Sequence, residues 1–297
     1  MMGRQLFALM LVMSACKAEL ADVPGNHLQG DGGMTDGAAE DSSQADAALP
    51  AFGPPAKHPT ASATALDEDD GSLTSDGLEM VFSVNEAGVG KDLYYTKRAS
   101  LTAAWSSATK LAISAVASDE TPRFSTDDLT LYFASARAGG AGSLDIWKAT
   151  RAAKGTSTFG TPTLVAGPNS AVLEKTYSPC GGAYVVVQGT DLAEGVVGAA
   201  PAPITVLNDA ATTETGPFLT QDCLRMYFAS ARDGTTKIYS SHRASMTAPW
   251  AAPVVAADIP AIVGATAMED PWLSPDERIL SVAATVGGTK DQYIVAR

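Results

Sequence analysis

The pentapeptide FASAR occurs twice in this chain, at residues 133–137 and again at residues 228–232. When the two copies are aligned, the preceding residues also agree: DETPRFSTDDLTLY comes before the first copy and TETGPFLTQDCLRMY before the second. Self-similarity of this kind indicates that a chain is built from copies of one structural unit. The repeat therefore limits the possible folds more than any other feature of the sequence.

Three further stretches follow the same pattern, at residues 67–83, 173–187 and 268–283. The shared pattern is a glutamate, an apolar residue, Ser or Thr, one further residue, Asp, and then an apolar run. The aspartates of this pattern are Asp76, Asp127, Asp222 and Asp276, and Cys180 has the corresponding place in the third unit. An aspartate side chain after Ser or Thr can bond the backbone of its own turn. The sequence thus predicts five units, each with a tight turn at this position.

Each unit contains four short segments that are typical of β-strands. In the second unit these are PRFS, LTLYFAS, DIWKAT and FGTPTLVA, with the glycine loop AGGAGS before the third segment. In the second segment, leucines alternate with residues that carry a hydroxyl group (LTLY), and β-forming residues are frequent. Four strands in about 40–50 residues are typical of one blade of a β-propeller.

With these motifs, residues 66–297 resemble the TolB-type, WD-repeat-like β-propeller repeat. The resemblance is carried by E-x-x-P, S-x-D, LYFAS-R, DIW and F-x-x-P, and it is weakest in the third unit, which has GAAPAPITVLN in place of an aromatic-x-x-Pro tail. It implies an all-β fold with five four-stranded blades. No duplicated catalytic motif is needed to explain why FASAR recurs.

The two ends of the repeat region predict how the ring closes. The last unit stops at Arg297 after its third strand, whereas AFGPPAKHPTASA at residues 51–63 looks like a unit tail, with Phe52 as its aromatic residue. If this tail supplies the missing fourth strand, no edge of the sheet is left exposed to aggregation. We therefore expect residues 51–63 to close the ring; the alternative is that they are further linker.

The N-terminus predicts export. Arg4, the apolar run LFALMLVM and the small residues before Cys16 resemble a bacterial lipoprotein signal, which implies a lipid anchor on Cys16 and an outer-membrane location. The alternative is an ordinary cleaved signal and a secreted protein. We predict a signal peptide at residues 1–16, a disordered acidic tether rich in Gly and Ala at 17–50, and the propeller at 51–297.

Composition excludes several classes of function. The formal net charge is −13 and no basic stripe is present, which argues against binding nucleic acid. The three histidines are far apart in the sequence, so a histidine-based metal site is not expected. We predict no cofactor, no metal and a monomer.

One acidic residue recurs in every unit and provides a candidate site. First strands of a propeller line the central channel, so these glutamates could form a ring at its mouth that binds a ligand or a cation. They are Glu68, Glu120, Glu174, Glu214 and Glu269. The alternative, which recurrence in every blade favours, is that each glutamate makes structural hydrogen bonds within its own blade. The acidic run LDEDDG at residues 66–71 lacks the spacing of a calcium loop and is expected to be a solvated end of the linker.

The remaining cysteines and the aromatic residues are expected to be structural. Cys180 and Cys223 have nearly the same place in adjacent units, and equivalent turns of neighbouring blades are commonly too far apart to be bridged. We expect two buried free thiols, with a disulfide as the alternative. Aromatic residues at repeat positions are predicted to pack in the core: Trp105, Trp147, Trp250, Trp272, Tyr132 and Tyr227.

The sequence favours a binding or scaffolding module in the cell envelope that contacts a protein or an envelope glycan. The alternative is a glycosidase-like five-bladed propeller enzyme that uses carboxylates of its channel. Such an enzyme needs two carboxyl groups in different environments. Because no two acids stand out from the repeated ones, no catalytic residue is predicted.

Overall fold

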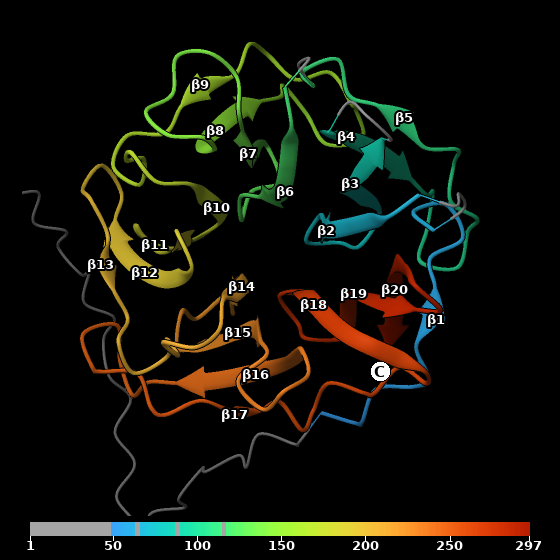
Figure 1. Cartoon of the computed structure of the whole chain (residues 1–297). Coiled ribbons are helices and arrows are strands. Elements are labelled where there is room, and N and C mark those ends of the chain that lie inside the picture. Colours follow the sequence, from blue (N-terminus) through green and yellow to red (C-terminus); the bar gives the residue numbers. More distant parts are fainter. Residues whose placement is uncertain (1–48, 63–65, 87–89, 115–116) are drawn as a thin grey trace, which may run out of the picture. The chain divides into compact units, whose positions relative to one another are not determined.

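The computed structural model describes residues 49–62, 66–86, 90–114 and 117–297. These residues form five antiparallel sheets of four strands each, which surround a common centre (Figure 1). The protein is an all-β, five-bladed β-propeller, as predicted. The predicted signal peptide, with Cys16, and most of the predicted tether lie outside the described residues. Among the described residues there is no helix that is long and apolar enough to cross a membrane.

Each blade contributes one strand to each of four concentric layers. The innermost strands are β2 (Glu68–Leu73), β6 (Asp119–Phe124), β10 (Glu174–Cys180), β14 (Glu214–Leu219) and β18 (Ala265–Leu273). The second strands are β3 (Glu79–Glu86), β7 (Thr130–Ser135), β11 (Ala183–Gln188), β15 (Arg225–Ser230) and β19 (Ile279–Val286). The third strands are β4 (Gly90–Lys97), β8 (Asp145–Thr150), β12 (Asp191–Val196), β16 (Lys237–His242) and β20 (Thr289–Ala296). The outermost strands are β5 (Thr109–Lys110), β9 (Thr163–Leu164), β13 (Ala202–Pro203), β17 (Val254–Val255) and β1 (Ala56–Lys57).

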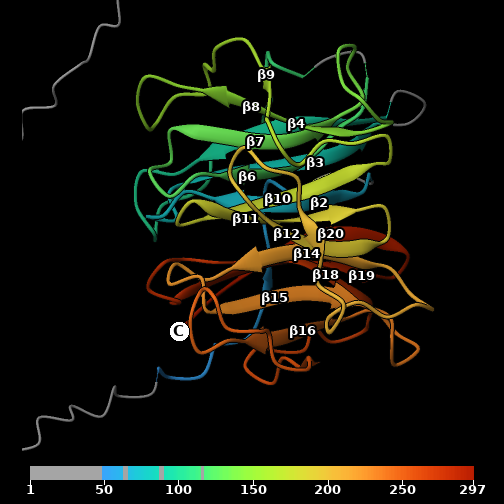
Figure 2. The same ribbon diagram turned by 90° about the vertical axis from the view of Figure 1, so that its left-hand side faces the viewer.

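The innermost strands contact one another in chain order around the centre, and β18 of the last blade returns to β2 of the first. In the side view the strands run roughly along the direction from which Figure 1 is seen (Figure 2). The inner strands therefore surround the centre of the ring, where their side chains line cavities; we call this central region the channel.

The N-terminal segment closes the ring. Strand β1 pairs antiparallel with β20, with Ala56 opposite Ile294 and Lys57 opposite Tyr293 (Figure 1). The N–H of His58 then donates to the carbonyl of Gln292 at 2.8 Å. The predicted closure by a strand from the N-terminal side is thus confirmed, and β20 is a covered strand instead of an exposed edge.

The predicted turn between the first two strands is present in four blades. The aspartate accepts a hydrogen bond from the backbone N–H two residues further on, for example from Leu129 to Asp127 at 3.0 Å. Its carboxylate also accepts the hydroxyl of the preceding Ser or Thr, as between Thr220 and Asp222 at 2.6 Å. In the third blade, which has Cys180 at this place, Gly181 and Gly182 adopt positive φ angles instead. Glycine can adopt this conformation without strain, so the turn forms without the aspartate.

An arginine follows the third strand in four blades and holds the blade together. Its Nε atom donates to a carbonyl in the turn between the first two strands; the pairs are Arg98 with Gly77, Arg151 with Asp128, Arg243 with Cys223 and Arg297 with Glu277. The same guanidinium groups lie 4.0–5.5 Å from aromatic rings of the outer segments, namely Trp105, Phe159, Trp250 and Phe52. We call this arrangement the arginine clamp. Phe52 has the role predicted for it, because it completes the clamp of the last blade.

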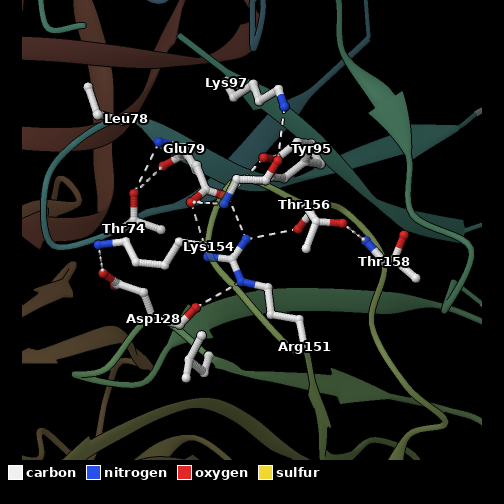
Figure 3. Close-up of polar contacts among 12 residues, drawn as sticks. Thr74, Leu78, Glu79, Tyr95, Lys97, Asp128, Arg151, Lys154, Thr156 and Thr158 are labelled. Carbon is white, nitrogen blue, oxygen red and sulfur yellow. Dashed lines mark hydrogen bonds and ion pairs between the residues drawn. The ribbon is translucent and has the colours of Figure 1, made fainter. Parts of the chain in front are cut away.

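Two of the clamps also join neighbouring blades. Arg151 of the second blade pairs with Glu79 of the first, and the Glu79 carboxylate also accepts the Tyr95 hydroxyl at 2.8 Å and the Gly155 N–H at 2.8 Å (Figure 3). Arg243 of the fourth blade pairs with Glu194 of the third at 2.7 Å. Both arginines are almost fully buried. Removing one partner would leave a buried charge unpaired, which is strongly destabilising.

Apolar side chains of adjacent blades pack into shared clusters, as the alternation of the strands requires. Most of the aromatic residues predicted for the core are buried, including Trp147, Trp250, Trp272 and Tyr227. Trp105 and Tyr132 are partly buried. Tyr132 packs against Tyr177 of the next blade with ring centroids 4.7 Å apart.

The expectation of two free thiols is wrong, because Cys180 and Cys223 form a disulfide. Cys180 ends the inner strand of the third blade, and Cys223 lies in the turn after the inner strand of the fourth. Inner strands are close to the ring axis, where neighbouring blades approach each other most closely, and the two Cα atoms are 5.8 Å apart. This distance is well within the reach of a disulfide.

Candidate functional site

The inner strand of every blade contains a β-bulge, and this bulge determines which acids meet in the channel. The pairing register with the second strand shifts at the same place in all five blades. The residue at the bulge has a positive φ in each blade; these residues are Asp70, Thr121, Thr176, Gly216 and Asp270. Bulges redirect the side chains next to them.

The five glutamates occupy two different positions relative to the bulge. Glu68, Glu174 and Glu214 precede the bulge residue by two positions, whereas Glu120 and Glu269 precede it by one. Successive side chains of a strand point to opposite sides, so an offset of one residue changes the surroundings of the side chain completely. The structure therefore does not bring the five glutamates together in one ring.

Glutamates at the earlier position make bonds inside the protein. Glu214 accepts the hydroxyl of Ser230 at 2.9 Å and pairs with Arg232 at 3.0 Å. Glu174 accepts the backbone N–H of Ser170 at 3.1 Å and an N–H of the Gln188 amide at 3.2 Å. The second blade has Asp119 at this position, paired with Arg137 at 2.7 Å. Glu68, at the corresponding place in the first blade, is buried.

Glutamates at the later position line a polar cavity in the channel. Glu120 contacts Lys175 at 3.1 Å and Lys91 at 3.5 Å, and Glu269 pairs with Lys290. The cavity has a volume of about 120 Å³. We call it the channel site and define it by its charged residues, Asp69, Asp70, Lys91, Glu120, Lys175, Glu269, Asp270 and Lys290. It has room for several water molecules, since one water needs roughly 10–15 Å³ by the same measure.

The first and last blades each contribute three of the charged residues of this site, and those of the first blade correct a second expectation. LDEDDG was expected to be a solvated end of the linker, but residues 68–71 belong to the buried strand β2. Asp69 contacts Lys91 at 2.7 Å and Lys290 at 3.5 Å, and Asp70 contacts Lys91 at 3.2 Å. The acidic run is buried, and lysines of the first and last blades neutralise part of its charge.

Three carboxylates of the site lie close together in the interior. Oxygen atoms of Asp69, Asp70 and Asp270 are within 4.8 Å of one another, and all three residues are buried. Burial, together with the neighbouring Asp70, raises the pKa of Asp69 to about 7. Burial also raises the pKa of Asp70, but the charge of Lys91 and a hydrogen bond with Asp69 outweigh it, so the pKa of Asp70 falls below its usual range. Burial and the charge of Asp70 raise the pKa of Asp270 well above normal. The cluster thus holds protons near neutral pH and does not carry three full charges.

Bulge residues of neighbouring blades contact one another directly. The N–H of Thr176 donates to the hydroxyl of Thr121 at 3.0 Å, and the N–H of Thr121 lies 3.3 Å from the carboxylate of Asp70. A Cβ atom at Gly216 would be 2.6 Å from the carboxylate of Asp270, so glycine is needed there for the two blades to approach. These contacts fix the position of the carboxylates around the channel.

Of the charged residues of the channel site, the repeat pattern predicted Glu120 and Glu269 and no others. The sequence did contain a signal for the aspartates. In the first and last units the bulge residue is an aspartate that directly follows another acid, as Asp69-Asp70 and Glu269-Asp270, whereas the other three units have Thr or Gly at the bulge. The lysines carried no comparable signal. Lys91 and Lys290 lie at the start of third strands, far in the sequence from the acids that they contact.

Comparison with known proteins supports the fold. No family model and no curated protein sequence matches this chain. Among solved structures, a GH43 endo-arabinanase from Bacillus licheniformis has a TM-score of 0.56 at 13% identity, covering 76% of this chain and 92% of that one. An α-L-arabinofuranosidase from Podospora anserina has a TM-score of 0.54 at 11% identity, covering 83% of this chain and 96% of that one. TolB from Acinetobacter baumannii has a TM-score of 0.44 at 13% identity, covering 78% of this chain and 55% of that one. At these identities the two similarities with TM-scores above 0.5 show a shared propeller fold and do not transfer an activity.

Proposed function

We propose that this protein is an envelope binding module whose channel site binds hydroxyl groups of a polyhydroxylated ligand, such as those at one edge of a sugar in an envelope glycan. The observation that supports this most directly is the mixture of carboxylates and ammonium groups around a cavity of about 120 Å³. Carboxylates accept hydrogen bonds and lysines donate them, while each sugar hydroxyl can do both. A ligand with many hydroxyls can therefore satisfy both kinds of group at once.

A free cation fits the site less well than a sugar. The acids already have cationic partners, since Lys91 alone contacts Asp69, Asp70 and Glu120. Lys290 adds a second positive charge beside Asp69 and also pairs with Glu269. A metal ion would have to displace these ammonium groups or be repelled by them.

The envelope location belongs to the same proposal. The disulfide between Cys180 and Cys223 supports it, because disulfides persist in oxidising compartments such as the bacterial periplasm and the cell surface. Attachment through a lipid on Cys16 remains a prediction from the sequence alone.

Glycoside hydrolysis is a second candidate, favoured by one observation. The pKa of Asp69 is raised to about 7 whereas that of neighbouring Asp70 is lowered, and such a divergence is typical of an acid and base pair. However, the two residues are adjacent in the chain, and oxygen atoms of their carboxyl groups lie within 4.8 Å of each other. Catalytic carboxyls of glycosidases lie about 5 Å apart or more, with the scissile bond between them. The geometry therefore favours binding over hydrolysis.

A glycan array followed by calorimetry tests the proposal. The wild-type protein should bind a class of oligosaccharide without releasing a product, and Glu120→Gln should weaken binding about tenfold, since a hydrogen bond to a charged group contributes roughly 1.5–3 kcal/mol and Gln keeps part of it. Glu86→Gln is the matched control, because Glu86 also faces a lysine, Lys110 at 3.8 Å, but does not line the cavity.

Three results would change the conclusion. Release of a shortened sugar that stops in Asp69→Asn would establish the hydrolase instead. Equal loss of binding in Glu86→Gln would place the ligand elsewhere. Failure of the wild-type protein to bind any glycan would leave a protein partner as the remaining reading.

A further inference from the structure

A second cavity lies in the channel beside the turns that join first and second strands. Its enclosed volume is about 90 Å³, and it opens to solvent. We call it the turn-side pocket; its walls come from all five blades, and its large apolar side chains are Leu73, Phe124, Phe218, Leu219, Trp272 and Leu273. It shares no lining residue with the channel site. Its predominantly apolar wall makes it unsuited to the ligand proposed for that site.

One buried cation lines this pocket. Arg123 follows the bulge of the second blade and is 3% exposed. Its terminal nitrogens lie 3.4 Å from the carbonyl of Gly71 and 3.5 Å from that of Pro271, beyond the usual 2.7–3.2 Å for such bonds. Its Nε atom is buried and has no hydrogen-bond partner. Leaving a buried charged donor unsatisfied is costly, so a ligand that supplies acceptors here would bind favourably.

The two acids that line the pocket are already engaged elsewhere. Asp128 accepts the N–H of Ser75 at 2.8 Å and pairs with Lys154 at 2.7 Å (Figure 3 shows the contact with Lys154). Glu277 lies 3.7 Å from Arg225 and 3.6 Å from Arg297. Neither carboxylate is paired with Arg123. Burial lowers the pKa of Arg123, and the carboxyl groups that act in the opposite direction, Asp270 and Asp70, belong to the channel site.

We propose that the turn-side pocket binds the carboxylate of a small apolar acid, with Arg123 as the anion-binding residue and Phe218 and Trp272 around the apolar body. A planar guanidinium matches a carboxylate with two parallel hydrogen bonds. The enclosed volume is smaller than the roughly 150 Å³ cavity that holds a benzene ring, so the enclosed part of the body is short. The same chemistry occurs in a free short-chain fatty acid and at the carboxyl terminus of a peptide with an apolar last residue.

Titration with hexanoate tests the proposal, with hexanol as the uncharged control of equal chain length. Hexanoate should bind, as measured by calorimetry and by a rise of the melting temperature, and hexanol should bind at least tenfold more weakly. Arg123→Gln should lose at least tenfold in hexanoate affinity. Arg278→Gln, an exposed arginine outside the pocket lining, should bind like the wild type.

A second variant keeps the test valid if Arg123→Gln fails to fold. Thr126 is an exposed turn residue that lines the pocket, so Thr126→Trp should block entry without removing a buried group. A peptide ending in Ala-Val with a free carboxylate, compared with its C-terminal amide, distinguishes the two sources of the carboxylate. Glu120→Gln should leave hexanoate binding unchanged, which separates this site from the channel site.

Equal affinity for hexanoate and hexanol would overturn the proposal. So would unchanged hexanoate binding in folded Arg123→Gln, or no binding of hexanoate and of either peptide to the wild-type protein. Binding of the peptide acid but not of hexanoate would support a chain terminus as the source, and binding of hexanoate alone would support a free acid.

Discussion

At the scale of single residues, His58 shows how local contacts of the closing segment stabilise the ring. Its side chain is 1% exposed, and Nδ1 accepts the N–H groups of Thr60 at 3.1 Å and Ala61 at 2.9 Å. The imidazole also lies 4.6 Å from the ring of Trp105 in the first blade. Burial, and then the charge of Arg98, lower the pKa of His58 to about 4. The neutral ring is therefore the form that fits the fold.

The first prediction is that His58 makes the protein sensitive to mild acid. Because its folded pKa is lowered from 6.5, the unfolded chain binds a proton first as the pH falls. The stability that the neutral imidazole contributes is fully present above pH 6.5 and is lost as the pH falls from 6.5 to 4. The loss of unfolding free energy is about 3 kcal/mol at pH 4. His58→Asn, which retains a side-chain acceptor, should flatten the dependence of unfolding free energy on pH in this window.

Urea unfolding at several pH values measures this effect. His242→Asn is the control, since His242 is exposed on strand β16. If both variants follow the wild-type pH dependence, another group is responsible for acid lability.

At the scale of elements, the arginine clamp explains why the tails of the units share an aromatic residue. The guanidinium joins the turn between the first and second strands to the outermost segment, so one residue contacts both the inner and the outer part of a blade. The third blade has no arginine at the corresponding place; Val197 is found there and is exposed. This blade is also the unit with the weakest sequence resemblance to the repeat. The clamp thus depends on both partners, and both are missing together.

The second prediction concerns Phe52, which completes the clamp of the last blade. Phe52→Ala should remove the contact with Arg297, 4.0 Å from the ring, and lower the unfolding free energy by about 2 kcal/mol, as the side chain is only partly buried. It should also increase hydrogen exchange at the β20 amides paired with β1, because the closing strand is only two residues long.

Phe159→Ala is the matched control for this effect. It removes the corresponding aromatic residue of the second blade, where the outer strand is connected directly to its own sheet. Similar loss of stability is expected, without faster exchange in β20. Unchanged exchange of β20 in Phe52→Ala would show that Phe52 does not hold the closing strand.

At the scale of the whole molecule, the five blades form one ring, so the joints between blades determine how it opens. The first and second blades are joined by Arg151 and Glu79, and the third and fourth by Arg243 and Glu194. The third and fourth are joined covalently as well, by the disulfide. This bond reinforces the blade that lacks its own arginine clamp.

The third prediction concerns this disulfide. Replacing both cysteines, Cys180→Ala with Cys223→Ala, should lower the unfolding free energy by about 2–4 kcal/mol, because the bond closes a loop with a sequence separation of 43 residues. Each single replacement should have nearly the full effect, since either one breaks the bond. Denaturant unfolding measures the change, and reductant should reproduce it in the wild type. A wild-type protein that unfolds identically with and without reductant would contradict the prediction.

The sequence alone determined the architecture. Strand-like segments recur in all five units, turn aspartates and aromatic tails recur in four, and Phe52 at one end complements the missing strand at the other; these are local signals that do not depend on distant contacts. The repeat therefore predicted five blades and the position of the closing strand. The arginine after the third strand could also have been recognised in the sequence, because it recurs at the same place in four of the five units.

Only the tertiary structure decided which side chains meet. A strand alternates its faces with every residue, so the one-residue difference between Glu214 and Glu269 relative to the bulge sends one to structural bonds and the other to the cavity. The distance between the Cα atoms of Cys180 and Cys223 likewise depends on how closely two inner strands approach each other. The length of the repeat does not determine that distance. The charged residues of the channel site come from four blades and the lining of the turn-side pocket comes from all five, because ring closure brings together side chains that are more than a hundred residues apart.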